Sequence, residues 1–356
     1  MFGFARRQTP LLGIDIGSTA VKLIELSQPS IDAAHLYQVD RYAIEPLPPS
    51  AMSEKKIADV EAVGRGIERA IQRSGTKSKR AAVAISGSAV ITKVIAMSES
   101  LSESEMESQL QLDADQYIPF PLEEVNLDFD VLGPSASTGM VDVLLAASRS
   151  ENVDDRVAAL EAAGVKTEIV DVEAYAMENV CTLMLGDKPE EQAGQILALA
   201  DIGSATTTLH VLHRGQVVYT REQKFGGQQL INEVQHRLGL TREAATKHVI
   251  ANDAPGGYET EILPPFREAV AQQIGRALQF FYSATTYNRA DQIILAGAAA
   301  SLPRLALIVE ERLGIRTEIA DPFSHMSVAK DLSASALKRD APALILAVGL
   351  ALRGFI

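Results

Sequence analysis

The sequence predicts an α/β fold of two lobes, each built from a mixed sheet with helices. Short apolar runs typical of buried strands alternate with stretches of helical spacing along most of the 356 residues. The tetrapeptide Asp-Ile-Gly-Ser occurs twice, at 15–18 and at 201–204, each time after an apolar run. A polar stretch at 187–194 separates the halves that carry the two copies. The length also favours about two domains.

The composition excludes several classes of function. Hydrophobic residues make up 47% of the chain and charged residues 22%, with a net charge of −13. Such an acidic surface repels nucleic acid and anionic lipid. The single Cys181 cannot form an internal disulfide, in agreement with a reducing compartment. No apolar run reaches the ~20 residues of a membrane span, and the N-terminus has no secretory h-region. We therefore expect a cytoplasmic protein that reaches a membrane only through a partner.

The first half is expected to be a lobe interrupted by a smaller unit. Strands are predicted at 11–16, 20–26, 35–44 and 165–170, and helices at 54–73, 150–163 and 172–185. Between them, the block 81–149 has a β-β-α-β-β pattern with strands at 81–85, 90–97, 125–132 and 140–147. Ser102 and Glu105 have capping-box spacing and should start its helix, which runs to about Tyr117.

The second half repeats the opening pattern of the first. Strands are predicted at 196–202, 206–212, 216–223 and 293–296, and helices at 228–238, 241–251, 259–287, 302–313 and 342–352. The tail from Ala347 to Ile356 is apolar with one arginine, Arg353. We expect its helix to close the second lobe.

The repeated motif has chemistry suited to phosphate. Glycine lets the turn approach a ligand closely. The hydroxyls of Ser18 and Thr19 in the first copy lie beside exposed backbone N–H groups that suit phosphate oxygens, and the second copy supplies Thr206 and Thr207. Lys22 can neutralise phosphate as a point charge.

The aspartates of the motif point to a metal ion. Phosphate repels a carboxylate unless a cation stands between them, so Asp15 and Asp201 predict a shared Mg²⁺ held through waters. Either copy alone fits an ordinary polar hairpin better. Its duplication in matching strand–turn–strand contexts favours the functional interpretation. A third element, the apolar strand 293–296 followed by the small residues 297–300, suits a flat purine or is a plain strand-to-helix connection.

The order of these three elements resembles that of the actin-like, Hsp70 and sugar-kinase ATPase superfamily. The block 81–149 resembles the 1C subdomain of its FtsA-like branch. Three segments resemble the PilM family of type IV pilus assembly proteins: Leu-Gly-Ile-Asp-Ile-Gly-Ser at 12–18 with Val21-Lys22, Asp-Gln-Tyr-Ile-Pro-Phe-Pro-Leu-Glu-Glu-Val at 115–125, and Leu-Gln-Phe-Phe-Tyr at 278–282. The resemblance covers nearly the whole chain.

This resemblance implies an actin-like two-lobed ATPase fold that binds ATP and Mg²⁺, with slow or no hydrolysis. Metal roles fall to Asp15 and Asp201. The nucleotide contacts carried over are Gly17, Ser18, Thr19, Lys22, Gly203, Ser204 and Thr206 for the phosphates, and Gly226, Gly227, Lys247 and Gly297 for the ribose and adenine side. The implied subdomains are 1A (1–80 and 150–190), 1C (81–149), 2A (191–225 and 288–356) and 2B (226–287).

The resemblance also implies a partner. PilM-type proteins capture the short cytoplasmic N-terminal tail of PilN, a single-span inner-membrane protein, in a groove between subdomains 1A and 1C. We expect the block 81–149 to supply one wall of that groove, which an extended peptide would fill. The protein would then work at the cytoplasmic face of the inner membrane. Other inner-membrane pilus assembly proteins and motor ATPases are further partners that the resemblance suggests.

Two alternatives stay open. A small-molecule kinase of the same superfamily needs a general base near the γ-phosphate. Asp171, Glu173 and Glu178 are available for that role, although exposed helical acids explain them equally well. An FtsA-like cell-division tether needs an amphipathic membrane-targeting helix. The apolar tail of this chain fits a core helix better.

Overall fold

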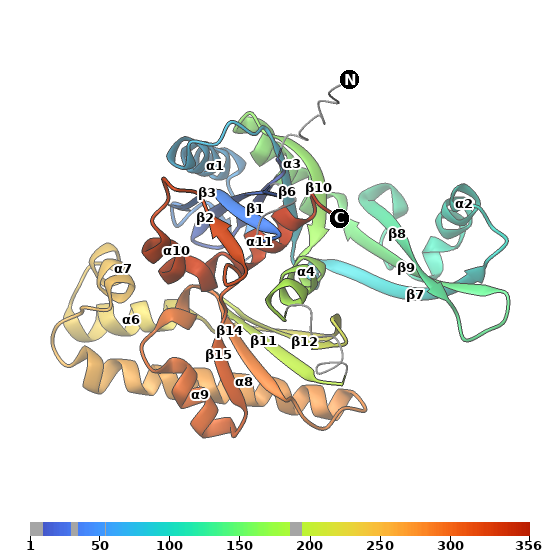
Figure 1. Cartoon of the computed structure of the whole chain (residues 1–356). Coiled ribbons are helices and arrows are strands. Elements are labelled where there is room, and N and C mark those ends of the chain that lie inside the picture. The colour runs from blue at the N-terminus through green and yellow to red at the C-terminus, as the bar shows by residue number, and fades with distance from the viewer. Residues whose placement is uncertain (1–9, 30–34, 54, 186–193) are drawn as a thin grey trace.

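The computed structural model of the chain describes residues 10–29, 35–53, 55–185 and 194–356. Two sheets dominate it, one above the other in Figure 1. The first has the order β10-β6-β1-β2-β3-β16, from β1 (Leu12–Ile16), β2 (Ala20–Ser27), β3 (Tyr37–Pro46), β6 (Arg80–Ile85), β10 (Lys166–Val172) and β16 (Met326–Val328). The second has the order β13-β12-β11-β14-β15, from β11 (Ile196–Ile202), β12 (Thr207–His213), β13 (Gln216–Gln223), β14 (Gln292–Ala296) and β15 (Arg316–Ile319).

The two sheets are structural repeats of one another. In each, three antiparallel strands are followed by two parallel ones, so that β1, β2, β3, β6 and β10 correspond to β11, β12, β13, β14 and β15. The register matches as well. Asp15 pairs with Lys22 across β1 and β2, and Asp201 pairs with Thr208 across β11 and β12. Both residues of the second pair lie 186 positions after those of the first, which is the offset of the Asp-Ile-Gly-Ser motif.

Helices cover the outer face of the first sheet. The helix α1 (Val60–Ser74) and the helix α3 (Ser150–Ala162) pack together there. The side chain of Asp59 caps α1 by accepting from the N–H of Ala62. We expected this helix from residue 54, but the residues before Asp59 form a two-stranded hairpin of β4 (Met52–Ser53) and β5 (Lys56–Ile57). Sequence periodicity missed this hairpin because its strands are two residues long.

Two helices fill the space between the sheets (Figure 1). They are α4 (Glu173–Leu185) and α11 (Ile345–Leu352), and they touch where a Cβ on Gly349 would lie 2.0 Å from the carbonyl oxygen of Ala176. We expected α11 to close the second lobe. Instead it packs on β1, β2 and β6, while β16 extends the edge of the first sheet beside β3. All eight residues of α11 are buried, because a helix that is apolar on every side needs cover all round.

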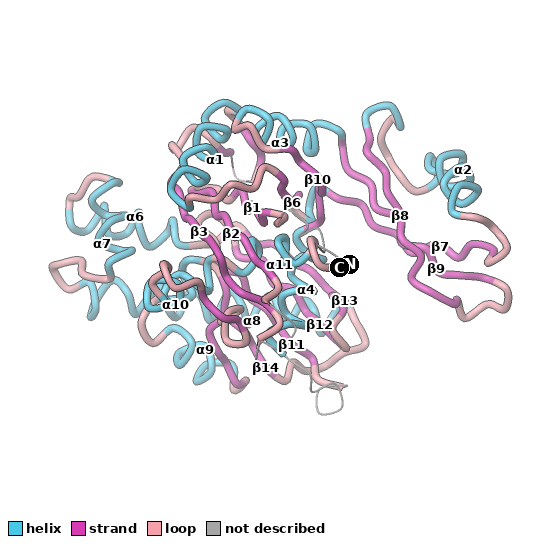
Figure 2. The backbone as a smooth tube through the Cα atoms, turned by 45° about the horizontal axis from the view of Figure 1, so that its top comes forward, coloured by secondary structure: helices cyan, strands magenta, loops and turns pink. Residues whose placement is uncertain are grey.

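A smaller three-stranded sheet stands apart from the first two (Figure 2). Its order is β7-β9-β8, from β7 (Val90–Ser98), β8 (Val125–Pro134) and β9 (Met140–Arg149), and α2 (Glu103–Asp113) packs on one face. The capping box of Ser102 and Glu105 is confirmed. The strand 81–85 does not belong to this unit, contrary to expectation. It is β6, between β1 and β10. Its mostly buried small and branched residues are typical of a strand inside a parallel sheet.

Four of the remaining helices belong to the second lobe, and α10 does not. They are α6 (Gly227–Leu238), α7 (Arg242–Ala251), α8 (Leu263–Ala284) and α9 (Leu305–Leu313), with α10 (Ala334–Asp340) nearer the chain end. The helix expected at 259–287 starts as a π-helical turn, Tyr258–Ile262, and ends at Ala284. Sequence patterns missed β15, β16 and α10. Within the described ranges, no helix is both long and apolar enough to span a bilayer.

Candidate functional site

The two Asp-Ile-Gly-Ser loops have matching turn geometry. The N–H of Gly17 donates to the carbonyl oxygen of Ala20 at 3.0 Å, and the N–H of Gly203 donates to that of Thr206 at 2.9 Å. A Cβ added to Gly17 or Gly203 would lie 3.1 or 3.0 Å from the same carbonyl oxygen. Each loop therefore joins its two strands by a turn too tight for a larger residue without adjustment.

Lys22 and Asp15 form an ion pair at the first loop. Lys22 Nζ lies 2.7 Å from Asp15 Oδ2, and Asp15 is only 7% exposed. Burial alone would lower the pKa of Lys22, but the charges of Asp15, Asp201 and Glu173 outweigh it and raise that pKa overall. The ammonium that we predicted to neutralise phosphate therefore stays charged.

Asp201 faces the same charges from the second lobe. Burial raises the pKa of Asp201 to about 6, with Asp15 and Glu173 adding to the rise and Lys22 and Lys55 opposing it. Asp15 is thus near enough to influence the ionisation of Asp201. The tertiary structure brings together the two loops that the repeat predicted.

Lys55 is a central residue that sequence reasoning missed. It lies between β4 and β5, and its Nζ is 2.7 Å from Glu173 Oε2 and 2.9 Å from Glu222 Oε2. Thr208 Oγ1 accepts from it at 3.4 Å. Burial opposes the charge on Lys55, but the two carboxylates raise its pKa well above the ordinary value. Since Glu222 belongs to β13 and Thr208 to β12, Lys55 links the first lobe to the second.

We call Asp15, Lys22, Lys55, Glu173, Asp201 and Glu222 the charged cluster. Four carboxylates and two ammonium groups meet there from both lobes. No local pattern identifies Lys55 or Glu222, whose positions in the chain are 167 residues apart.

The start of α6 closes tightly over the second loop. The N–H of Gly227 donates to the carbonyl oxygen of Gly203 at 2.9 Å, and that of Gln228 donates to Ser204 at 2.8 Å. A Cβ on Gly226 would lie 2.5 Å from each of those two carbonyl oxygens. Gly226 is therefore required for the close approach of α6 to the loop, whereas a Cβ on Gly227 would make only ordinary contacts.

Gly297 joins the same loop from the end of β14. Its φ is 85°, in the left-handed region, and a Cβ there would lie 2.4 Å from the carbonyl oxygen of Ile202 and 2.5 Å from Asp201 Oδ1. The short 3-10 helix Ala298–Ser301 follows directly. The strand-to-small-residue segment at 293–300 thus meets the second loop at Gly297.

The other residues predicted for the two loops differ in their exposure to solvent. Ser18 and Ser204 are partly exposed at their loops, Thr19 is exposed and Thr206 is buried. The hydroxyl of Thr207 donates to the carbonyl oxygen of Phe225 at 2.7 Å, so its role is structural.

Lys247 is exposed on α7, which packs on α6. Within the described part of the chain, no hydrogen bond or ion pair connects it to the loops.

The three acids near the connecting helix are not exposed helical acids. Asp171 lies on β10, and Glu173 and Glu178 lie on α4 and are partly buried. Glu173 belongs to the charged cluster, and Asp171 is 7% exposed with Arg353 Nε 3.3 Å from its carboxylate. Glu178 accepts from the N–H of Val217. Of these three acids, only Glu173 faces the loops.

The residues at the loops fit a phosphate ligand with a hydrated divalent ion. Within the described ranges, no group of three or more His, Cys, Asp or Glu side chains is placed to hold a metal directly. Two carboxylates, Asp15 and Asp201, match the few protein ligands that Mg²⁺ takes when it keeps its waters. Burial raises the pKa of Asp201 although the charges of Lys22 and Lys55 lower it. A divalent cation beside Asp201 would lower this pKa further and favour the charged carboxylate.

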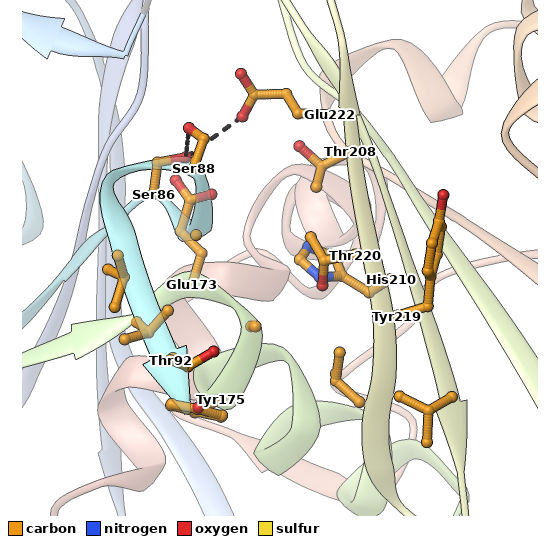
Figure 3. A pocket seen from close by; sticks show the side chains of 16 residues that line it. Ser86, Ser88, Thr92, Glu173, Tyr175, Thr208, His210, Tyr219, Thr220 and Glu222 are labelled. Atoms are coloured by element: carbon orange, nitrogen blue, oxygen red, sulfur yellow. Dashed lines mark hydrogen bonds between the residues drawn. The ribbon is translucent and has the colours of Figure 1, made fainter. Parts of the chain in front are cut away.

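A cavity of about 340 Å³ opens beside the charged cluster (Figure 3). The first lobe and the small sheet contribute the 3-10 turn Gly87–Ala89, the start of β7 and the start of α4. The strands β12 and β13 form the opposite wall. Glu173 and Glu222 line the cavity and also pair with Lys55, so the cavity and the charged cluster share a wall.

Hydroxyl and imidazole groups give the cavity polar contacts among apolar ones. Ser86 Oγ donates to Glu222 Oε2 at 3.3 Å, and Figure 3 shows this link at one end of the cavity. His210 Nδ1 lies 3.2 Å from Thr220 Oγ1, and burial lowers the pKa of His210 to about 3. This imidazole is therefore neutral at physiological pH.

Comparison with known proteins gives consistent results. A profile described as type IV pilus assembly protein PilM matches residues 13–355. A solved structure described as the PilM-PilN type IV pilus biogenesis complex shares 27% identity, with a TM-score of 0.78 over 98% of this chain and 99% of that chain. The ethanolamine utilization protein EutJ from Carboxydothermus hydrogenoformans shares 16% identity, with a TM-score of 0.57 over 96% and 89%, a likeness of fold alone.

The predicted actin-like two-lobed fold is confirmed by these neighbours together with the repeated sheet. The family match spans both lobes and the small sheet. This chain belongs to the type IV pilus assembly protein PilM family.

Proposed function

We propose that this protein is an ATP-binding, actin-like cytoplasmic scaffold of type IV pilus assembly that binds the N-terminal tail of inner-membrane PilN. Its place would then be the cytoplasmic face of the inner membrane. One observation carries the nucleotide part: two equivalent glycine loops from two lobes bring Asp15, Lys22 and Asp201 into one charged cluster. The partner part rests on family membership and on the neighbouring structure, which is a PilM-PilN complex.

In this proposal the loops hold the phosphates of ATP. Backbone N–H groups and hydroxyls of tight glycine turns are suited to phosphate oxygens. When bound, Mg²⁺ neutralises phosphate charge, with Asp15 and Asp201 holding its waters. The other contacts are Gly17, Ser18, Thr19, Lys22, Gly203, Ser204 and Thr206 on the phosphate side, and Gly226, Gly227, Gly297 and Lys247 on the ribose and adenine side.

We expect slow or no hydrolysis. A carboxylate that activates water must be free to accept its proton. Glu173 is the acid at the start of α4 that faces the loops, and the ammonium of Lys55 is bonded to it. A scaffold that holds nucleotide fits this arrangement better than a metabolic kinase does.

The cavity supports the peptide part of the proposal. Its walls include residues of β7 from the small sheet and of α4 from the first lobe, as expected for a groove between subdomains 1A and 1C, and β12 and β13 add a third wall. We propose 1C as residues 86–149, since β6 belongs to the first sheet. An extended tail would bury apolar side chains against Val90 and Tyr175 and use the hydroxyls for backbone contacts.

Calorimetric titration with Mg·ATP, with and without a synthetic PilN tail peptide, tests the proposal. We expect nucleotide binding with slow turnover, and binding of the peptide whether or not nucleotide is present. Failure to bind Mg·ATP would overturn the nucleotide part. Unchanged capture of PilN after deletion of its tail would overturn the partner part.

Two assays test the alternatives. Fast ATP turnover with a metabolite would favour a kinase. Flotation of the purified protein with liposomes would favour a direct membrane tether, which the burial of α11 argues against for that helix.

A further inference from the structure

One face of the small sheet is left open by the fold. Side chains alternate between the two faces of a strand. Ile95, Met97, Val143, Leu145 and Phe129 point to the face that packs with α2. The opposite face carries Thr92, Val94 and Ala96 of β7, Asp142, Leu144 and Ala146 of β9, and Asp128 and Asp130 of β8, and we call these residues the open sheet face.

The open sheet face has an apolar side and an acidic side. In register across the three strands, Thr92 pairs with Ala146 and Ala146 with Asp128, while Val94 pairs with Leu144 and Leu144 with Asp130. Val94 is 59% exposed, and neither Val94 nor Leu144 belongs to a packed apolar cluster of the described residues. We call Val94 and Leu144 the apolar stripe. Neighbouring apolar side chains left open to solvent in this way are typical of a binding surface.

The carboxylates on this face lack a cationic partner among the residues that the structure describes. Within the described ranges, Asp128, Asp130 and Asp142 form no ion pair. Asp128 and Asp130 are exposed, and two residues apart on one strand they point the same way. Like charges held side by side favour an occupant that brings positive charge.

The open sheet face continues from the cavity. Val90 and Thr92 line the cavity, and Val94 and Ala96 follow them on the same face of β7. The outer edge of β7 is unpaired in the described part of the chain, since this strand pairs only with β9. A chain that leaves the cavity along β7 therefore meets the apolar stripe first and the carboxylates beside it.

We propose that the open sheet face binds a basic segment of the membrane partner, the one that follows the part of the tail held in the cavity. This inference rests on the proposed function. Cytoplasmic residues next to a membrane span are rich in Lys and Arg. Such a segment would pair its cations with Asp128, Asp130 and Asp142, and would contact Val94 and Leu144 with its apolar side chains.

Two synthetic peptides of the PilN tail test this inference by calorimetry. The short peptide ends before the Lys/Arg-rich residues that adjoin the span, and the long peptide includes them. We expect the long peptide to bind about three- to tenfold tighter at low salt, as a few exposed ion pairs allow. That difference should shrink at about 0.5 M salt because screening weakens exposed pairs.

Variants of the protein assign the effect to this surface. The double variant Asp128→Asn with Asp130→Asn should bind the long peptide no better than the short one, while its affinity for the short peptide stays unchanged. A matched control, Glu103→Gln with Glu107→Gln, removes the same charge from exposed positions of α2 and should keep the full difference.

Several results would overturn the inference. The long peptide could bind no tighter than the short one, the Asp variant could keep the difference, or the control could abolish it equally. A change in self-association of the Asp variant in sedimentation velocity, with peptide affinities unaltered, would assign the face to a second copy instead. If the wild-type protein bound neither peptide, the proposed function itself would fail.

Discussion

Lys55 and Glu222 form an ion pair that crosses from one lobe to the other, with Nζ 2.9 Å from Oε2. The same ammonium lies 2.7 Å from Glu173, and Glu222 also accepts from Ser86 at the cavity. Lys55 therefore connects the charged cluster to the wall of the cavity. A ligand that draws Lys55 away would leave two carboxylates of that wall without their cation.

Replacing Lys55 tests this link. We expect Lys55→Met to lower the free energy of unfolding by roughly 1–3 kcal/mol, because two partly buried carboxylates lose their partner. Urea denaturation measures the change. Lys56→Met is the matched control, since its side chain is exposed, and should stay within about 0.5 kcal/mol of wild type. Equal effects of the two variants would contradict a role for Lys55 between the lobes.

Variants of Lys22 and Asp15 distinguish an effect on stability from an effect on ligand binding. We expect Lys22→Met to destabilise the fold by roughly 1–3 kcal/mol, because the nearly buried carboxylate of Asp15 then has no counter-charge. Adding Asp15→Asn should restore much of that stability, since the uncompensated charge is then gone.

Nucleotide binding should not recover in the same double variant. Calorimetry should show an affinity for Mg·ATP at least about tenfold below wild type in both the single and the double variant, as charge-assisted contacts are lost. A double variant that bound Mg·ATP normally would remove both residues from the proposed site.

Asp201 predicts a pH dependence of stability. Its folded pKa of about 6 lies above the ordinary value of 3.8, so the folded protein binds the proton more tightly than the unfolded chain does. This group therefore makes the fold more stable as pH falls from about 7 toward 4, and its unfavourable contribution is complete only above about pH 7.

Asp201→Asn should remove that dependence and raise the free energy of unfolding at pH 7.5 by about 1–2 kcal/mol. Urea denaturation at pH 5.0 and 7.5 measures both effects, and Glu243→Gln, at an exposed position of α7, is the control. An unchanged difference between the two pH values in Asp201→Asn would show that other groups cause it.

Gly297 should tolerate no side chain. Gly297→Ala places a Cβ within 2.5 Å of both the Ile202 carbonyl oxygen and Asp201 Oδ1 at a φ of 85°. We expect a loss of stability of roughly 2 kcal/mol or more, from strain and overpacking, together with loss of Mg·ATP binding. Thermal unfolding and calorimetry measure the two effects.

Ala298→Gly is the control for that prediction. Ala298 is exposed at the next position, so its replacement should cost about 1 kcal/mol or less. A Gly297→Ala protein as stable as Ala298→Gly would contradict the close approach of this segment to the second loop.

Local pattern was enough to predict most elements. The strands β11 and β13 have the predicted bounds, and the Ser102 capping box forms as its spacing indicated. Errors came where a segment's neighbour lies far along the chain. The strand β6 looked like part of the block after it, but it pairs with β1 and β10. The final helix looked like part of the second lobe, but it packs on β1.

The candidate site was likewise predictable from the sequence only in part. The repeat predicted that the loops at Asp15 and Asp201 face one another, and the contribution of Asp15 to the raised pKa of Asp201 agrees with it. Their roles toward nucleotide and metal stay predictions. Glu173 appeared among three acids of one segment, and only packing distinguishes it from Asp171 and Glu178. No pattern indicated Lys55, Thr208 or Glu222.

By itself, the sequence determined the two halves, their repeated loops and their strand–turn–strand hairpins, because hydrophobic period and turn chemistry act between residues close in the chain. Only the tertiary structure decided which charges meet between the lobes and which face of the small sheet stays open. The charges that meet between the lobes come from segments separated by more than a hundred residues, as for Lys55 with Glu173. Such pairings cannot be predicted from local sequence, because each charged residue taken alone has the pattern of an ordinary surface charge.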